Sequence, residues 1–159
     1  MKAKTIMDFA GQFGVRIALN DSLLVTLNGR YFLLNDALKP YVKEDFFYAG
    51  TFLGKAKGGK FFPSFILLAM LAKAGGNRMV IDGKAAWLFI CGRDVFSKGI
   101  VRRFGSVRRN CNVLVLNEFG ECLGFGKVLA GLDAQGAKNE VALQNVSDVG
   151  DFLRRERGF

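Results

Sequence analysis

Six basic residues fall within the segment 92–109, against a single acidic residue, Asp94. Gly92 and Gly99 would let the backbone approach a phosphate closely, and arginine guanidinium groups offer forked donors that suit phosphate oxygens. The pattern predicts binding of a polyanion; the alternative is a solvated loop whose arginines keep an exposed region soluble. The basic side chains are Arg93, Lys98, Arg102, Arg103, Arg108 and Arg109.

A second group of cations stands near the C-terminus. We expect a helix there that begins near Ser147, a plausible N-cap, and reaches about Arg157. Cations at the C-terminal end of a helix interact favourably with its macrodipole, so helix capping explains these arginines as completely as ligand binding does. The group consists of Arg154, Arg155 and Arg157.

The sequence offers little for catalysis. It contains no histidine, which excludes Ser-His-Asp and Cys-His arrangements and removes the commonest general base. The three cysteines, Cys91, Cys111 and Cys122, form no CxxC pair and are interpreted as small hydrophobic residues in a reducing compartment. Asp94 stands among arginines and is expected to form a structural ion pair. We expect no enzymatic activity, no cofactor and no metal site.

Two glycine-rich segments resemble nucleotide-binding motifs only superficially. The loop Lys55 to Lys60 lacks the G-x-x-x-x-G-K-[ST] spacing; it could form a second basic contact or a hairpin tip, although a solvated loop is favoured. The segment Leu123 to Gly126 matches half of a dinucleotide fingerprint but lies in a strand pattern. Among the aromatic residues, Trp87 is expected in the core. Phe96 and Phe104 alternate with basic residues and could stack on bases, although a core position is favoured for Phe96.

Composition narrows the class of partner. Half of the 159 residues are hydrophobic, which excludes disorder, and the net charge of +9 indicates an anionic partner, most often nucleic acid. A membrane surface would prefer a basic amphipathic helix, for which only the extreme C-terminus is a faint candidate. The longest apolar stretch, Phe61 to Ala72, is too short to span a membrane, and Met1 to Ala10 lacks the apolar region of a signal peptide. We expect a soluble cytoplasmic protein without a membrane partner.

The first half of the chain mixes helix and strand patterns. Asn28-Gly29 predicts a type I′ turn between two short strands, and Gly75-Gly76 should stop an apolar helix that Pro63 starts. The expected elements are a helix at Lys4–Phe13, strands at Ser22–Leu27, Arg30–Leu34 and Phe46–Leu53, a helical turn at Asp36–Tyr41 and a buried helix at Ser64–Ala74.

The second half changes to short strands separated by turns. Gly75-Gly76-Asn77 is the best boundary and divides the chain into domains 1–76 and 77–159. The fold class is α+β, an N-terminal antiparallel α/β domain followed by a small barrel-like β domain. The five strands expected in that barrel are Arg78–Ile81, Ala86–Cys91, Asn112–Asn117, Cys122–Leu129 and Glu140–Gln144.

The order of three segments in the second half resembles a PUA domain, the small RNA-binding pseudo-barrel named after pseudouridine synthases and archaeosine transglycosylases. These segments are Trp87–Ile100, Leu123–Gly126 and Val149–Glu156. The first half carries Gly50–Lys55, then Lys60-Phe61 and an apolar helix. Together these parts are similar to the archaeal-type members of the Nip-seven family of large-subunit ribosome biogenesis factors. The likeness runs from about residue 24 to residue 156.

This resemblance implies a non-catalytic RNA-binding protein that acts in pre-rRNA processing and large ribosomal subunit biogenesis. The PUA domain would bind single-stranded or irregular pre-rRNA, and the N-terminal domain would contact other ribosome-assembly proteins. In archaeal members of the family, basic residues of the C-terminal segment carry RNA binding, and Arg154 and Arg155 match them. Further lysines can follow in such relatives, whereas this chain continues with Arg157, Gly158 and Phe159; the arginines of segment 92–109 could compensate.

Other functions stay open at this point. The main alternative is a PUA-containing adaptor in tRNA modification or translation, and an RNA-modifying enzyme ranks lower because residues 1–74 offer no cofactor loop or metal set. The location implied is the cytoplasm, or the nucleolus if the source is eukaryotic.

Overall fold

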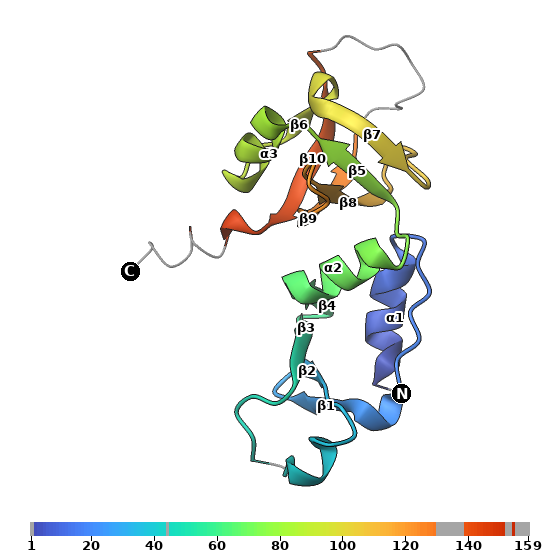
Figure 1. The fold of residues 1–159 in the computed structure, drawn as a ribbon, viewed down its shortest axis with the longest axis vertical. Coiled ribbons are helices and arrows are strands. Elements are labelled where there is room, and N and C mark those ends of the chain that lie inside the picture. The colour runs from blue at the N-terminus through green and yellow to red at the C-terminus, as the bar shows by residue number, and fades with distance from the viewer. Residues whose placement is uncertain (1, 44, 130–138, 152–153, 155–159) are drawn as a thin grey trace.

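The computed structural model describes residues 2–43, 45–129, 139–151 and 154. Two lobes follow one another along the long axis of the molecule, each with its own sheet (Figure 1). Three α-helices accompany the sheets within the described residues: α1 (Ala3–Gly11), α2 (Phe65–Lys73) and α3 (Gly83–Ile90). Short 3-10 turns lie at Asp21–Leu23, Lys39–Tyr41 and Ser97–Gly99.

The sheet of the N-terminal lobe is antiparallel, in the order β1-β2-β3-β4. Its strands are β1 (Leu24–Leu27), β2 (Arg30–Leu33), β3 (Thr51–Lys57) and β4 (Lys60–Pro63). Asn28 and Gly29 both have positive φ, 50° and 75°, which confirms the type I′ turn expected there. Gly58 and Gly59, with φ of 58° and 74°, make a similar two-residue turn between β3 and β4.

The segment 46–60 differs from its prediction. The expected strand Phe46–Leu53 begins only at Thr51, and the expected solvated loop after it is a β-hairpin. Phe46 and Tyr48 place their rings 5.5 and 5.1 Å from the ring of the buried Phe32. Their apolar character therefore reflects an aromatic cluster and not a strand.

The helices of this lobe were correctly expected. Ser64 Oγ accepts a hydrogen bond from the Leu67 N–H at 3.1 Å, so Ser64 caps α2, and Pro63 is the last residue of β4. Leu67, Leu68 and Leu71 are buried. Both α1 and α2 thus present an apolar face to one core.

The sheet of the C-terminal lobe is curled, with strand order β6-β10-β9-β8-β5-β7. All its pairs are antiparallel except the parallel pair of β5 and β8. Its strands are β5 (Arg78–Ile81), β6 (Val95–Phe96), β7 (Ile100–Phe104), β8 (Asn112–Leu116), β9 (Cys122–Val128) and β10 (Val141–Asp148).

Four of the five expected strands are present in this sheet, and one expectation is wrong. The segment Ala86–Cys91 belongs to the helix α3 and its C-terminal cap, while β6 and β7 were not anticipated. Ser147 lies within β10 and is not a helix N-cap; the helical residues Gly150, Asp151 and Arg154 come after the strand.

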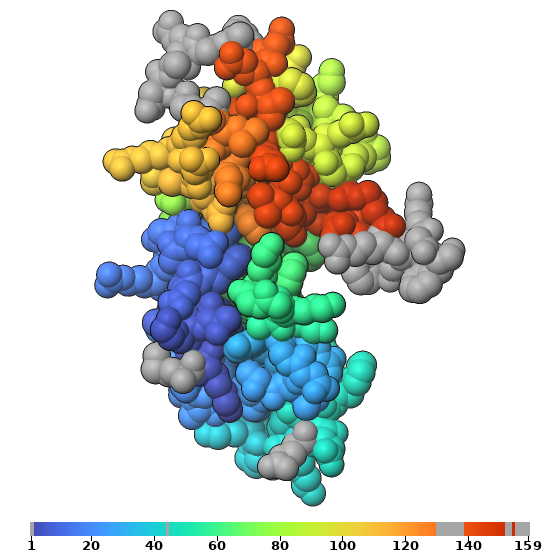
Figure 2. Space-filling model, turned by 180° about the vertical axis from the view of Figure 1, so that it is seen from behind, coloured from blue at the N-terminus to red at the C-terminus, as the bar shows by residue number. Residues whose placement is uncertain are grey.

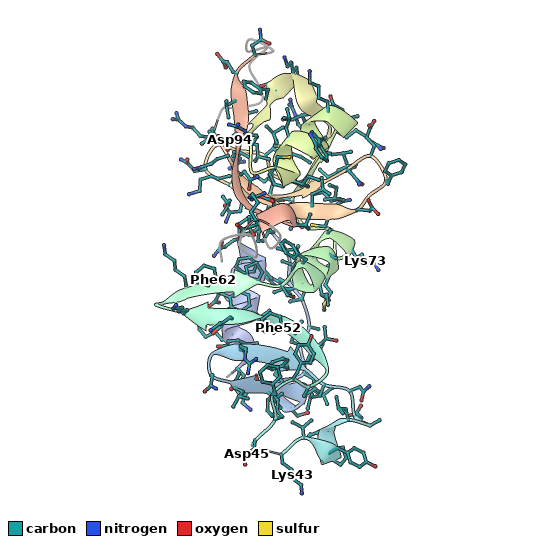
Figure 3. The ribbon with its side chains drawn as sticks, turned by 90° about the vertical axis from the view of Figure 1, so that its left-hand side faces the viewer. Lys43, Asp45, Phe52, Phe62, Lys73 and Asp94 are labelled. Atoms are coloured by element: carbon teal, nitrogen blue, oxygen red, sulfur yellow. The ribbon has the colours of Figure 1, made fainter. Side chains whose placement is uncertain are left out.

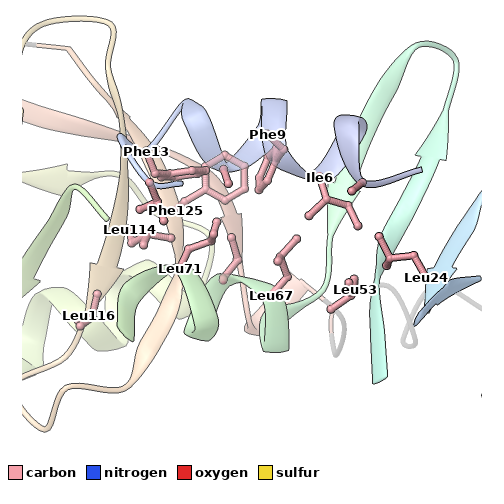
Figure 4. Packing of buried hydrophobic residues seen from close by; sticks show 14 of the residues in the cluster. Ile6, Phe9, Phe13, Leu24, Leu53, Leu67, Leu71, Leu114, Leu116 and Phe125 are labelled. Atoms are coloured by element: carbon pink, nitrogen blue, oxygen red, sulfur yellow. The ribbon is translucent and has the colours of Figure 1, made fainter. Parts of the chain in front are cut away.

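A single core joins the two lobes. Side chains of α1, α2 and β3 pack against Leu114, Leu116 and Phe125 of the second sheet (Figure 4). The rings of Phe13 and Phe125 meet edge to face, with centroids 5.4 Å apart. The opposite face of the second sheet encloses a separate core that includes Phe89 of α3. The second sheet is thereby fixed between α3 on one side and the N-terminal lobe on the other.

Candidate nucleic-acid interface

Helix α3 is defined by strong signals at both ends. Asp82 Oδ1 accepts a hydrogen bond from the Ala85 N–H at 2.8 Å, which caps the N-terminus. At the other end, Gly92 has φ of 88°, its N–H donates to the Phe89 carbonyl at 2.9 Å, and the Arg93 N–H donates to the Leu88 carbonyl at 3.0 Å. These two bonds make a Schellman motif. The glycine at position 92 thus ends a helix, not a strand.

One face of α3 carries an aromatic side chain into solvent. Trp87 is 65% exposed, whereas Phe89 is fully buried against the sheet. Lys84 and Cys91 are also exposed, and their spacing of three and four residues from Trp87 places all three on one side of the helix. The expectation of a core position for Trp87 is therefore wrong, because a helix separates Trp87 from Phe89, which a strand would place on the same face.

A groove of about 360 Å³ runs beside this face, between α3 and the β6–β7 connection. Lys84 and Leu88 line one side, and Phe96 and Lys98 line the other. Phe96 is 42% exposed and Lys98 Nζ lies 5.9 Å from its ring centroid, so the core position favoured for Phe96 is also wrong. Gly99 allows the close approach of the two sides, because a Cβ there would lie 2.7 Å from Ala85 Cβ. An aromatic ring, two cations and the carboxylates of Asp82 and Asp94 therefore border one depression.

Asp94 has a different partner from the one expected. Its Oδ1 accepts a hydrogen bond from the Asn145 N–H at 2.8 Å. Among the described residues it forms no ion pair with an arginine. Asp94 therefore fixes the loop after α3 to strand β10 (Figure 3), and leaves the neighbouring cations facing solvent.

The basic residues of segment 92–109 are exposed but do not form one cluster. Arg93 follows α3, while Arg102 and Arg103 lie along β7, an edge strand that pairs only with β5. Arg108 and Arg109 lie beyond β7, in a loop tied to the junction of the lobes. That loop is held by the Ser106 N–H, which donates to Asn77 Oδ1 at 2.8 Å. The cations of this segment are therefore spread from the end of α3, along β7, to the junction of the lobes.

Arg154 is anchored to the protein, although its side chain remains 42% exposed. Its Nη1 donates to the Ile90 carbonyl at 2.7 Å and to Asp148 Oδ1 at 3.1 Å, and its Nη2 donates to Asp148 Oδ2 at 2.8 Å. Asp148 is 2% exposed, and Asn145 Nδ2 also donates to it at 3.1 Å. The hydrogen bonds from Arg154 to Asp148 raise the pKa of the guanidinium above its usual range.

This guanidinium joins β10 to the last turn of α3, so Arg154 acts first as a structural clamp. Arg155 and Arg157, the other C-terminal candidates, lie outside the described residues. The described parts of the chain hold no group of three or more metal-ligating side chains. None of the helices in those parts is long and apolar enough to cross a membrane.

The curled sheet, the helix α3 and the order of strands correspond to a known domain type. A family model described as the UPF0113 PUA domain matches residues 77–157. The chain belongs to this family. A UPF0113 protein of Archaeoglobus fulgidus is 30% identical over 114 residues, which cover 70% of this chain and 64% of that relative. The chain thus spans less than two thirds of that relative's length.

Solved structures show the same fold. A conserved PUA domain protein from Thermoplasma acidophilum matches with a TM-score of 0.63 and 20% identity, covering 98% of this chain and 93% of its own. A PUA domain from Aeropyrum pernix K1 matches with a TM-score of 0.60 and 17% identity, covering 92% of this chain and 82% of its own. The PUA domain suggests an RNA partner.

Proposed function

We propose that this protein binds single-stranded or irregular RNA through the α3 face of its PUA domain, defined as Lys84, Trp87, Arg93, Phe96 and Lys98. The observation that carries the proposal is the exposure of Trp87 on α3, with Lys84 on the same helix and Arg93 just after it. An exposed indole is unfavourable in water, and stacking on a base buries it at little conformational cost. Unpaired RNA offers open bases for such stacking.

The cations of this face supply the electrostatic part. Lysines and arginines attract phosphates and release counterions, so affinity should fall steeply with salt. Arg102 and Arg103 extend the same charge along β7. Phosphate contacts position the RNA, and stacking at Trp87 and Phe96 selects unpaired over paired segments.

The biological role we propose is in pre-rRNA processing and large ribosomal subunit biogenesis, without catalysis, as in the Nip-seven family. The chain contains no histidine to act as a general base. Tyr41 and Phe47 at the tip of the N-terminal lobe are 79% and 82% exposed, which supports protein contacts there. We place this activity in the cytoplasm, or in the nucleolus of a eukaryotic cell.

Filter-binding titrations of the full chain against single-stranded and double-stranded RNA test the binding. The expected result is tighter binding of the single strand, with a log–log salt slope of roughly −0.7 per phosphate contact. Undetectable or salt-independent binding at low ionic strength would refute the proposal. Sequencing of RNA crosslinked in cells separates the roles, because large-subunit precursors support the proposed one and mature tRNA would support an adaptor.

A further inference from the structure

A cleft of about 660 Å³ opens between the two lobes, away from the α3 face. Helix α1 forms one wall, the β3–β4 hairpin forms a second, and strands β8 to β10 form the third. Figure 2 shows the side of the molecule on which the dark blue α1, the green hairpin and the orange strands meet. The cleft is therefore lined by elements of both lobes.

A row of polar side chains crosses the sheet at this wall. Lys127 of β9 pairs in register with Asn112 of β8 and with Gln144 of β10. Because side chains alternate along a strand, Asn112 and Lys127 share a sheet face with Leu114 and Phe125, which lie in the core between the lobes. The face is apolar where the lobes touch and polar where the cleft opens.

The walls offer both a stacking surface and a hydrogen-bonding pair. Phe61 is half-buried in the wall, and its ring is backed by the buried Phe9, whose centroid lies 5.2 Å from that of Phe61 and 5.9 Å from that of the buried Phe125. Asn112 Nδ2 donates to Gln12 Oε1 at 2.9 Å. Within the described residues, no other hydrogen bond uses the Gln12 amide NH₂ or the Asn112 side-chain carbonyl. A donor and an acceptor side by side match the edge of a nucleobase.

The charge of the cleft is positive. Lys60 and Lys127 line it and are exposed, and neither forms an ion pair within the described residues. Among the described residues that line the cleft, Asp8 is the only carboxylate, and Lys4 Nζ lies 2.7 Å from its Oδ2. Two lysines at the mouth of a cleft that also presents the ring of Phe61 suit a nucleotide and its flanking phosphates.

We propose that this cleft is a second RNA site, in which a nucleotide of single-stranded RNA places its base against the ring of Phe61 and its phosphates at Lys60 and Lys127. The proposal rests on the proposed function and extends it to both lobes. The loop that carries Arg108 and Arg109 is tied to the end of β9, since the adjacent Asn110 N–H donates to the Val128 carbonyl at 2.7 Å, next to Lys127.

The test compares two double variants of equal charge. Lys60→Ala with Lys127→Ala removes the cleft lysines, and Lys43→Ala with Lys73→Ala removes two exposed lysines remote from it (Figure 3). The cleft variant should bind single-stranded RNA more weakly, with a salt slope shallower by about 1.4, because each phosphate contact contributes roughly 0.7. The control variant should match the wild type, and both should keep the wild-type melting temperature.

Equal slopes for the cleft and control variants, with wild-type binding intact, would overturn the cleft proposal and leave the proposed function standing. Absence of RNA binding by the wild type at low salt would overturn both. UV crosslinking gives an independent readout: an RNA adduct at Phe61 supports the cleft, and adducts confined to residues 83–104 contradict it.

Discussion

The α3 face and the C-terminal Arg154 are both basic, yet their surroundings differ completely. Lys84 and Lys98 lie in solvent beside exposed aromatic rings, whereas Arg154 is held by a buried carboxylate and a helix carbonyl. A guanidinium that already makes three hydrogen bonds to the protein has fewer donors left for a phosphate. The number of arginines in a segment therefore does not locate an RNA site. The hydrogen-bond partners of each arginine decide whether it is available to a phosphate.

Loss of the Arg154 side chain should have the largest effect, and the effect should be on stability. Arg154→Ala leaves the buried Asp148 without its charged partner, so the melting temperature should fall by several degrees. Arg154→Lys keeps the charge but loses the two-pronged geometry, and should be intermediate. Thermal unfolding followed by circular dichroism measures both.

Asp148→Asn serves as the partner variant for this prediction. Combined with Arg154→Ala it should destabilise less than the sum of the single changes, since both remove the same interaction. If Arg154→Ala keeps the wild-type melting temperature but loses RNA binding, Arg154 contacts RNA directly and is not mainly a structural clamp.

Trp87→Ala should give the largest loss of RNA affinity among exposed positions. Stacking on a base contributes about 1–3 kcal/mol, which corresponds to roughly 5-fold to 150-fold in Kd. The melting temperature should not change, because the side chain lies in solvent. Trp87→Phe is the matched control and should retain most of the affinity in filter binding. Wild-type affinity of Trp87→Ala would exclude the indole from the interface.

Removal of the cations at the α3 face should have a smaller effect that depends on salt. Arg93→Ala with Lys98→Ala should make the log–log salt slope shallower by about 1.4 if each side chain contacts one phosphate. Lys43→Ala with Lys73→Ala again controls for net charge. A parallel shift of both double variants would show that only the overall charge matters.

Cysteine labelling should give the smallest effect, and it should show whether bound RNA covers the α3 face. Cys91 is exposed next to the α3 face, on the side of the helix that carries Trp87, while burial raises the pKa of the Cys122 thiol and slows its alkylation. Bound RNA should slow the reaction of Cys91 with iodoacetamide and leave that of Cys122 unchanged, as measured by peptide mass spectrometry. Equal rates for Cys91 with and without RNA would contradict contact at this face.

Much of the fold could be predicted because local signals agree with it. Asn28-Gly29 specifies the first hairpin, and Ser64 with Gly75-Gly76 bounds α2. The segment Ala86–Cys91 failed because a short apolar run has no periodicity that distinguishes a buried strand from a helix. The signals that decide it lie outside the run, at Asp82 and Gly92, which cap the two ends of α3.

The candidate site was predictable only in part. Charged side chains are expected at the surface, and Arg93 and Lys98 are indeed exposed. Trp87 was missed because its exposure depends on the helix that the sequence did not reveal. The clamp of Arg154 by Asp148 depends on where β10 ends and where α3 lies, and such tertiary contacts leave no local pattern.

UV crosslinking of the full wild-type protein to single-stranded RNA, followed by peptide mass spectrometry, tests directly whether the α3 face binds RNA. We predict RNA adducts within the peptide that spans 83–104, at Trp87 or Phe96. A protein that binds RNA but yields no adduct anywhere in 83–104 would contradict the α3 face as the RNA site.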